Sequence, residues 1–175
     1  DTEAFEVQEY AAGTADFSGF GGTPLRQGVQ GQPMEISRTV LLDDAADRTR
    51  PQLVELSDGR KMIFFIGSRG GAGELNSMAL YYSVCEEGVW SIPEMVADDG
   101  TADSNPTVLE KNGKVVVAWA DAARLYTEDD TNMDKLNALG ISMAIYENGK
   151  MGREITLVED EFFNFAPQLN LVDDT

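Results

Sequence analysis

The stretch that decides the fold is residues 96–119, VADDGTADSNPTVLEKNGKVVVAW. It contains an apolar pair, an acidic pair, Pro106 with an aliphatic residue two positions later, and the turn Asn112-Gly113. An Asn-Gly step between two segments rich in β-branched residues is typical of a β-hairpin. Residues 114–119 are almost continuously apolar, which indicates a strand that is covered on both faces.

The same pattern occurs three times, aligned on Pro51, Pro106 and Pro167. In each copy an apolar pair and an acidic pair precede the proline, which we expect to be the first residue of a strand, where it removes no hydrogen bond from the sheet. Four antiparallel strands per copy describe a blade of a β-propeller. Further matches extend the copies at Pro51 and Pro106 to such four-stranded units: the turns Ser57–Gly59, Glu86–Gly88 and Asn148-Gly149, the strands 61–66 and 114–119, and the similar stretches Ser77–Tyr81 and Ser142–Tyr146.

The predicted fold class is therefore all-β, with antiparallel four-stranded blade repeats that form a partial β-propeller. Two complete copies do not close a ring, because propellers usually have at least four blades. We expect residues 35–175 to belong to a larger domain, and the chain to be a piece of a longer protein. Residues 1–34 are predicted to hold one strand (4–10) and a Gly-rich loop (17–32). A helical turn is predicted at 130–139, stopped by Gly140, between the second and third strands of its blade.

The composition excludes several function classes. The chain has 13 Lys and Arg residues against 31 Asp and Glu, a net charge of −18, and no histidine, so it has no Ser-His-Asp triad and no imidazole metal ligand. Its single cysteine, Cys85, can form neither an internal disulfide nor a cysteine zinc site. Strong negative charge disfavours nucleic acid. No apolar stretch reaches the roughly 20 residues that span a bilayer, so we expect no membrane insertion.

Residues 80–91, LYYSVCEEGVWS, followed by Asp98–Asp103, resemble blade repeats of large cell-surface proteins from Gram-positive gut bacteria, which are related to the sialidase-like β-propellers. The resemblance covers about residues 35–172. It implies an extracellular location on the bacterial cell surface and a host protein, such as an immunoglobulin, or a glycan as partner. A second partner would be the remainder of the chain's own propeller.

The resemblance also raises an enzymatic alternative, a fragment of a sialidase-like carbohydrate-active enzyme. Arg50 beside Pro51, with Arg69 further on, resembles the family pattern in which an arginine contacts the substrate carboxylate. The spacing differs by one residue, and Cys85 stands where the family's Ser-x-Asp-x-Gly-x-x-Trp box has its aspartate. The positions equivalent to Arg50 are Asn105 and Ala166, so we interpret Arg50 as a loop residue and assign no catalytic residue.

The acidic segment Asp98–Asp103 offers hard oxygen ligands suitable for Ca²⁺. Because an acidic pair recurs in every copy, we favour a structural role in which short carboxylates accept backbone hydrogen bonds in a turn. No cofactor is expected, with calcium as the alternative. Aromatic residues at strand positions are expected to pack between blades rather than to bind ligand; they are Tyr81, Tyr82, Trp90, Trp119 and Tyr126.

The sequence therefore favours a non-catalytic binding or adhesion module that contacts its partner through loops, especially residues 67–76 and 127–139. Loops on a rigid scaffold are the usual place for recognition. The enzyme fragment and a purely structural spacer are the alternatives.

Overall fold

The computed structural model describes residues 40–41, 50–70, 73–160 and 162–172. The chain divides into two units, residues 1–38 and 39–175, and the described residues all belong to the second. The predictions made for residues 1–34 and for the acidic pair Asp43-Asp44 lie outside the described residues.

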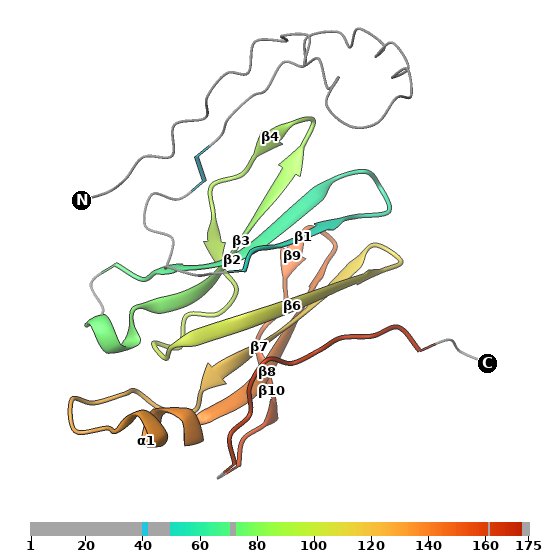
Figure 1. The fold of residues 1–175 in the computed structure, drawn as a ribbon. Coiled ribbons are helices and arrows are strands. Elements are labelled where there is room, and N and C mark those ends of the chain that lie inside the picture. Colours follow the sequence, from blue (N-terminus) through green and yellow to red (C-terminus); the bar gives the residue numbers. More distant parts are fainter. Residues whose placement is uncertain (1–39, 42–49, 71–72, 161, 173–175) are drawn as a thin grey trace, which may run out of the picture. The chain divides into compact units, whose positions relative to one another are not determined.

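The first sheet is antiparallel and follows the order of the chain (Figure 1). β1 (Gln52–Glu55) pairs with β2 (Lys61–Ser68), and β2 pairs with β3 (Met78–Glu86). The outer edge of β3 pairs with two short strands, β4 (Val89–Trp90) and β5 (Glu94–Met95). A 3-10 turn, η1 (Glu74–Asn76), lies between β2 and β3.

The second sheet has the same sequential order. β6 (Asp103–Lys111) pairs with β7 (Lys114–Ala122), and β7 pairs with β8 (Leu139–Glu147). The strand β8 also pairs with β9 (Lys150–Met151) and with β10 (Ile155–Val158). A short helix, α1 (Asn132–Asn137), lies between β7 and β8. The prediction of an all-β, antiparallel fold is confirmed. Neither of the two described sheets closes on itself.

Three of the predicted hairpin turns have the backbone that their residues favour. Glu87-Gly88, Asn112-Gly113 and Asn148-Gly149 all have positive φ at both positions, with values of 50° and 82°, 56° and 80°, and 54° and 78°. Two successive left-handed residues make a type I′ turn, whose twist matches that of the flanking strands. The hairpins at these positions are therefore built from local sequence.

The prediction that every proline begins a strand is wrong for Pro106. This proline lies inside β6, where the pairing with β7 shifts register between Ser104 and Thr107. Its neighbour Asn105 has a left-handed φ of 49°. A proline at such an irregularity removes no ladder hydrogen bond, because the ladder is already interrupted there. Pro51, by contrast, directly precedes β1.

The predicted helical turn is confirmed, but its predicted end is wrong. α1 begins after Thr131, whose hydroxyl oxygen accepts the backbone N–H of Asp134 while the Asp134 carboxylate accepts that of Thr131. The helix ends at Asn137, Ala138 caps its C-terminus, and Gly140 lies within β8. A Cβ atom at Gly140 would collide with the Val158 carbonyl of β10, so glycine is needed here for a close approach of strands.

The main core lies between the two sheets, where β6 contacts β1, β2 and β3. Buried Trp119 and Tyr82 confirm the prediction that aromatic residues pack there, whereas Tyr81 lies outside this cluster and stacks on Phe65. The buried members of the core are Leu56, Met62, Phe64, Ile66, Leu80, Tyr82, Val96, Val115, Val117, Trp119, Ala144 and Tyr146. Among the described helices, none is long and apolar enough to cross a bilayer.

Candidate functional site

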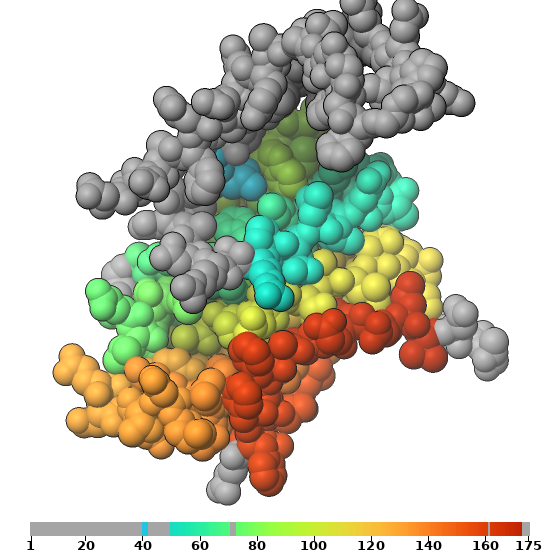
Figure 2. Space-filling view, viewed as in Figure 1, coloured from blue at the N-terminus to red at the C-terminus, as the bar shows by residue number. Residues whose placement is uncertain are grey.

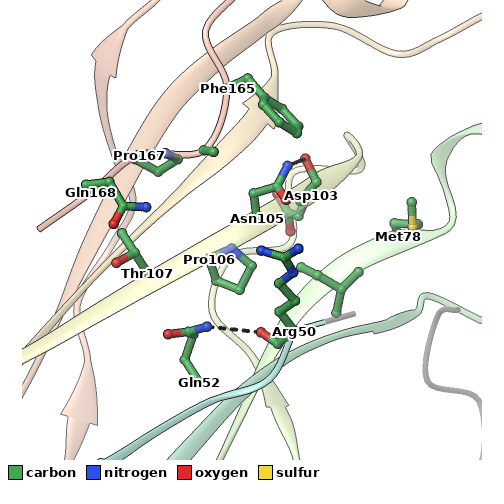
Figure 3. Close-up of a pocket in the computed structure, with 13 residues that line it drawn as sticks. Arg50, Gln52, Met78, Asp103, Asn105, Pro106, Thr107, Phe165, Pro167 and Gln168 are labelled. Carbon is green, nitrogen blue, oxygen red and sulfur yellow. Dashed lines mark hydrogen bonds between the residues drawn. The ribbon is translucent and has the colours of Figure 1, made fainter. Parts of the chain in front are cut away.

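A cavity of about 580 Å³ lies where three segments that are distant in sequence converge (Figure 3). Each segment belongs to one copy of the sequence pattern: Arg50 and Gln52 flank Pro51, residues 103–107 contain Pro106, and residues 165–168 contain Pro167. Ile66 and Met78 contribute apolar surface from the first sheet. The walls thus combine one guanidinium group, three side-chain amides, small hydroxyls and a few apolar side chains.

The backbone around the prolines presents these side chains. Asn105 and Ala166 directly precede Pro106 and Pro167, and both have left-handed φ angles, 49° and 53°. The side chain of exposed Arg50 points into the cavity from the start of β1, while the carbonyl oxygen of Arg50 accepts a hydrogen bond from Gln52 Nε2 at 3.2 Å (Figure 3). Phe165 is 52% exposed, which leaves an aromatic surface open at the rim.

The charge of the cavity wall depends on Asp103, the one acidic residue among the described residues that line the cavity. Burial raises the pKa of the Asp103 carboxyl to about 8, and the nearby charges of Asp121 and Asp99 act in the same direction, against the hydrogen bond from the Leu80 amide. Asp103 is therefore largely neutral at pH 7. Among the described carboxylates, none forms an ion pair with Arg50, so the guanidinium gives this cavity a positive character within an acidic protein.

The described lining residues offer groups suited to binding. Ser104 and Thr107 supply hydroxyl groups, and the hydrogen bond that the Ser104 hydroxyl oxygen makes is from Asn105 Nδ2, at 3.5 Å. A nucleophile needs an adjacent base within hydrogen-bond distance, and among the described lining residues none forms a hydrogen bond with Ser104 or Thr107 as such a base. Guanidinium and amide groups suit carboxylates and hydroxyls instead.

The two arginines of the sialidase-like pattern are not brought together. Arg50 lines the cavity, whereas Arg69 does not. The Arg69 side chain is only 10% exposed; its Nε lies 3.1 Å from Asp98 Oδ1, and its Nη1 donates to the carbonyl of Thr101 at 3.2 Å. Arg69 therefore holds the segment before β6 against the end of β2, which is a structural task.

The acidic segment Asp98–Asp103 does not act as one ligand set. Asp99 makes the turn hydrogen bond that we predicted, accepting the Thr101 amide at 2.9 Å, and Asp160 accepts the Phe162 amide in the same way. Asp98 faces Arg69, and the Asp103 carboxylate accepts the Leu80 amide at 2.7 Å. The predicted structural role of the acidic pairs in turns is confirmed for the two described copies.

A different carboxylate cluster forms from Asp99, Asp121 and Glu154, whose oxygens lie within 4.8 Å of one another. Burial, and then a hydrogen bond shared with the Glu154 carboxyl, raise the pKa of Asp121. The Asp121 oxygens also accept hydrogen bonds at 2.9 Å from the hydroxyls of Thr101 and Ser142. Three carboxylates at this spacing could hold a divalent cation, and a shared proton satisfies the same oxygens, so calcium binding stays a prediction.

The first predicted binding loop, residues 67–76, contacts Tyr126, the residue directly before the second predicted loop, residues 127–139. Asn76 Nδ2 donates to the Tyr126 carbonyl at 2.9 Å, and the Tyr126 amide donates to Asn76 Oδ1 at 2.8 Å. Figure 1 shows η1 and α1 on the same side of the molecule. The loops border a shallow hollow of about 610 Å³, lined by Gly73–Asn76, Tyr126–Glu128 and Lys135.

Residues 83–90, which match the Ser-x-Asp-x-Gly-x-x-Trp box only in part, form the β3–β4 hairpin. Ser83 Oγ donates to the Ser91 carbonyl at 2.8 Å, and Cys85 pairs with Trp90 across the turn. Cys85 is a half-buried free thiol. The two contacts named above hold the hairpin together.

Comparison with known proteins gives no match, either to a protein-family model or to a curated protein.

Several residues of these sites were missed by sequence reasoning. Asp121 and Glu154 belong to no acidic pair, although Asp121 interrupts an apolar run and could have been noticed for that reason. Gln168 occupies the same place after its proline as Gln52, which is a signal that the alignment already contained. Phe165 carried no signal, because its position at the cavity results from the path of the chain after β10.

Proposed function

We propose that this chain is a non-catalytic binding module whose cavity between the three proline segments takes a carbohydrate that carries a carboxylate. The observation that carries this proposal is the guanidinium of Arg50, which forms no ion pair with any described carboxylate, in a cavity otherwise lined by amides, hydroxyls, apolar surface and the buried Asp103 carboxyl. Guanidinium binds a carboxylate through two parallel hydrogen bonds, amides bind sugar hydroxyls, and Phe165 offers a ring on which a pyranose can stack.

The blade-like organisation supports the proposal. Gln52 and Thr107 each follow their proline and each pair with the second strand of their sheet, with Phe64 and Ala118 respectively. Side chains just before and after successive prolines then point at the same cavity. In this proposal the sheets are blades of a partial propeller on an extracellular bacterial surface protein.

The test is titration of the full chain with acidic and neutral monosaccharides, such as N-acetylneuraminate, glucuronate and glucose, followed by NMR. We expect the side-chain amide signals of Asn105 and Gln168 to shift with the acidic sugars. Arg50→Gln should weaken that binding about tenfold or more, since a charge-assisted hydrogen bond is lost. Arg153→Gln is the matched control, because it removes the same charge from a cation outside the cavity. Equal loss in both variants, or no shift at the amides, would contradict the proposal.

A separate activity assay tests the enzymatic alternative, which Arg50 also keeps open. Release of the fluorophore from a fluorogenic sialoside by the unsubstituted chain, abolished by Arg50→Gln, would assign a sialidase-like activity instead of binding alone.

A second candidate is recognition of a host protein, including immunoglobulin, through the joined loops. The reciprocal hydrogen bonds between Asn76 and Tyr126 favour it, because they hold two loops as one preformed surface. Capture from serum or mucus, identified by mass spectrometry and lost in Asn76→Ala but kept in Arg50→Gln, would favour this surface. Failure of both binding tests would leave a structural spacer.

A further inference from the structure

We infer that residues 167–172 and the outer face of the second sheet together form a docking site for a third sheet of the same design, supplied by a further β2–β3-like hairpin of the same polypeptide. This inference concerns assembly and does not depend on what the cavity binds.

The first observation is an unpaired strand. Pro167-Gln168-Leu169 repeats Pro51-Gln52-Leu53 letter for letter, and the latter leads into β1, which pairs with β2. Pro167 and Gln168 lie beside the stretch 104–107 of β6, since both line the cavity, and Figure 2 shows the C-terminal segment (red) adjacent to β6 (yellow). Within the described part of the chain, however, residues 167–172 make no backbone–backbone hydrogen bond.

The second observation is that the outer face of the second sheet is apolar and does not pack against the first sheet. On β7, Val115 and Val117 point into the core between the sheets, so strand alternation directs Val116 to the opposite face. Its cross-strand partner Ile145 lies on that face too. Both side chains are half-buried, and the neighbouring Ile155 on β10 is 47% exposed.

The strand registers indicate what should cover this face. Phe64 pairs with the residue after Pro51, and Ala118 pairs with the residue after Pro106, so Phe64 and Ala118 are corresponding positions. Phe64 lies on the face of the first sheet that packs on the second sheet. Ala118, with Val116 two residues before it, lies on the corresponding face of the second sheet. The two sheets are therefore stacked in the same orientation, with corresponding faces turned the same way. A third sheet would pack on the face that carries Val116, as the second sheet packs on the face of the first that carries Phe64.

Residues 167–172 would be the first strand of that third sheet. They need a second strand that pairs as β2 pairs with β1, and whose alternate side chains are large and apolar, as Met62, Phe64 and Ile66 are. One hairpin of this pattern would form hydrogen bonds with the backbone of residues 167–172 and would also cover the apolar face around Val116 and Ile145. Exposed strand edges and apolar patches of this kind mark sites of strand addition.

The test appends a second copy of residues 54–100 directly after Leu169 and measures hydrogen exchange. We expect one of the two neighbouring amides, that of Gln168 or that of Leu169, to exchange at least about tenfold more slowly, because every second amide of a strand donates to the strand paired with it. The control extension carries Phe64→Lys and Leu80→Lys in the added copy and should give no protection. Unchanged exchange in an extension that gains β-sheet signal by circular dichroism would overturn the proposal.

A second measurement uses the unextended chain and needs no foreign segment. Val116→Thr and Val117→Thr are the same isosteric change on neighbouring residues of one strand. We expect Val117→Thr to lower the Tm by roughly 5 °C, since a hydroxyl is buried in the core, and Val116→Thr to change it by about 1 °C or less. Equal losses would mean that the outer face is already covered within the chain. Self-association in sedimentation that Val116→Thr abolishes would assign the face to a second copy. Either result overturns the proposal.

Discussion

Replacing Asp103 by asparagine tests the electrostatics of the cavity wall. Asp103 is 3% exposed and its Oδ2 accepts the backbone N–H of Leu80 at 2.7 Å. Burial raises the pKa of this carboxyl to about 8. An aspartate in the unfolded chain has a pKa of about 4. The native state therefore keeps a proton over a range of pH in which the unfolded state has lost it.

The sign of the effect follows from proton counting. Between about pH 4 and the folded pKa of about 8, the native state binds more protons than the unfolded state, so the free energy of unfolding falls as the pH rises. At pH 7 this difference extends over about three pH units, which corresponds to a loss on the order of 4 kcal/mol. Asparagine has nearly the same shape, and its amide oxygen can accept the Leu80 N–H, but it does not ionise.

We therefore expect Asp103→Asn to be the more stable protein at pH 7, and its advantage to shrink towards pH 5. Urea denaturation of both proteins from about pH 5 to about pH 8 measures this difference. Some fall with pH should remain in the variant because burial also raises the pKa of Asp121. Asp58→Asn is the control: hydrogen bonds from Arg60 lower the pKa of this exposed carboxyl, so no advantage of that variant should grow above pH 5. Parallel stability curves for Asp103→Asn and the unsubstituted chain would refute the reasoning.

Three further substitutions test the fold and the loop surface. Asn76→Ala should speed amide exchange at Tyr126 about tenfold, with little change at β7, because the two bonds between the loops are lost; equal rates would contradict a joined surface. Gly140→Ala should displace β10, since the added Cβ meets the Val158 carbonyl, and faster exchange confined to residues 155–158 would report it. Trp119→Ala should cost about 3–5 kcal/mol in urea unfolding because its side chain is fully buried between the sheets, and a loss below about 1 kcal/mol would place it outside the core.

The hairpins were predictable because their geometry is local. A turn of two left-handed residues favours asparagine and glycine at these two positions, and Asn112-Gly113 and Asn148-Gly149 therefore predict it from the sequence. The strand–turn–strand order and the helical turn between β7 and β8 followed from the same local signals.

Pairing between distant stretches was less reliable. Ser77–Tyr81 and Ser142–Tyr146 match in letters, yet Met78 begins β3 whereas Met143 lies in the middle of β8. Equivalent positions in the two sheets are set by the turns and the cross-strand register, and an alternation of apolar and polar residues can match in several registers.

The sequence by itself determined that this chain builds sequential antiparallel hairpins, that its two described acidic pairs lie in turns, and that it has no histidine and cannot form an internal disulfide or a cysteine zinc site. These properties depend on composition and on neighbours a few residues apart. Only the tertiary structure decided that Arg50, Asn105 and Gln168 line one cavity. It also placed Asn76 in hydrogen bonds with Tyr126, and the Asp121 carboxyl close to those of Asp99 and Glu154. Such meetings depend on how two sheets stack and where their ends converge, and burial within that stack is what makes Asp103 retain its proton.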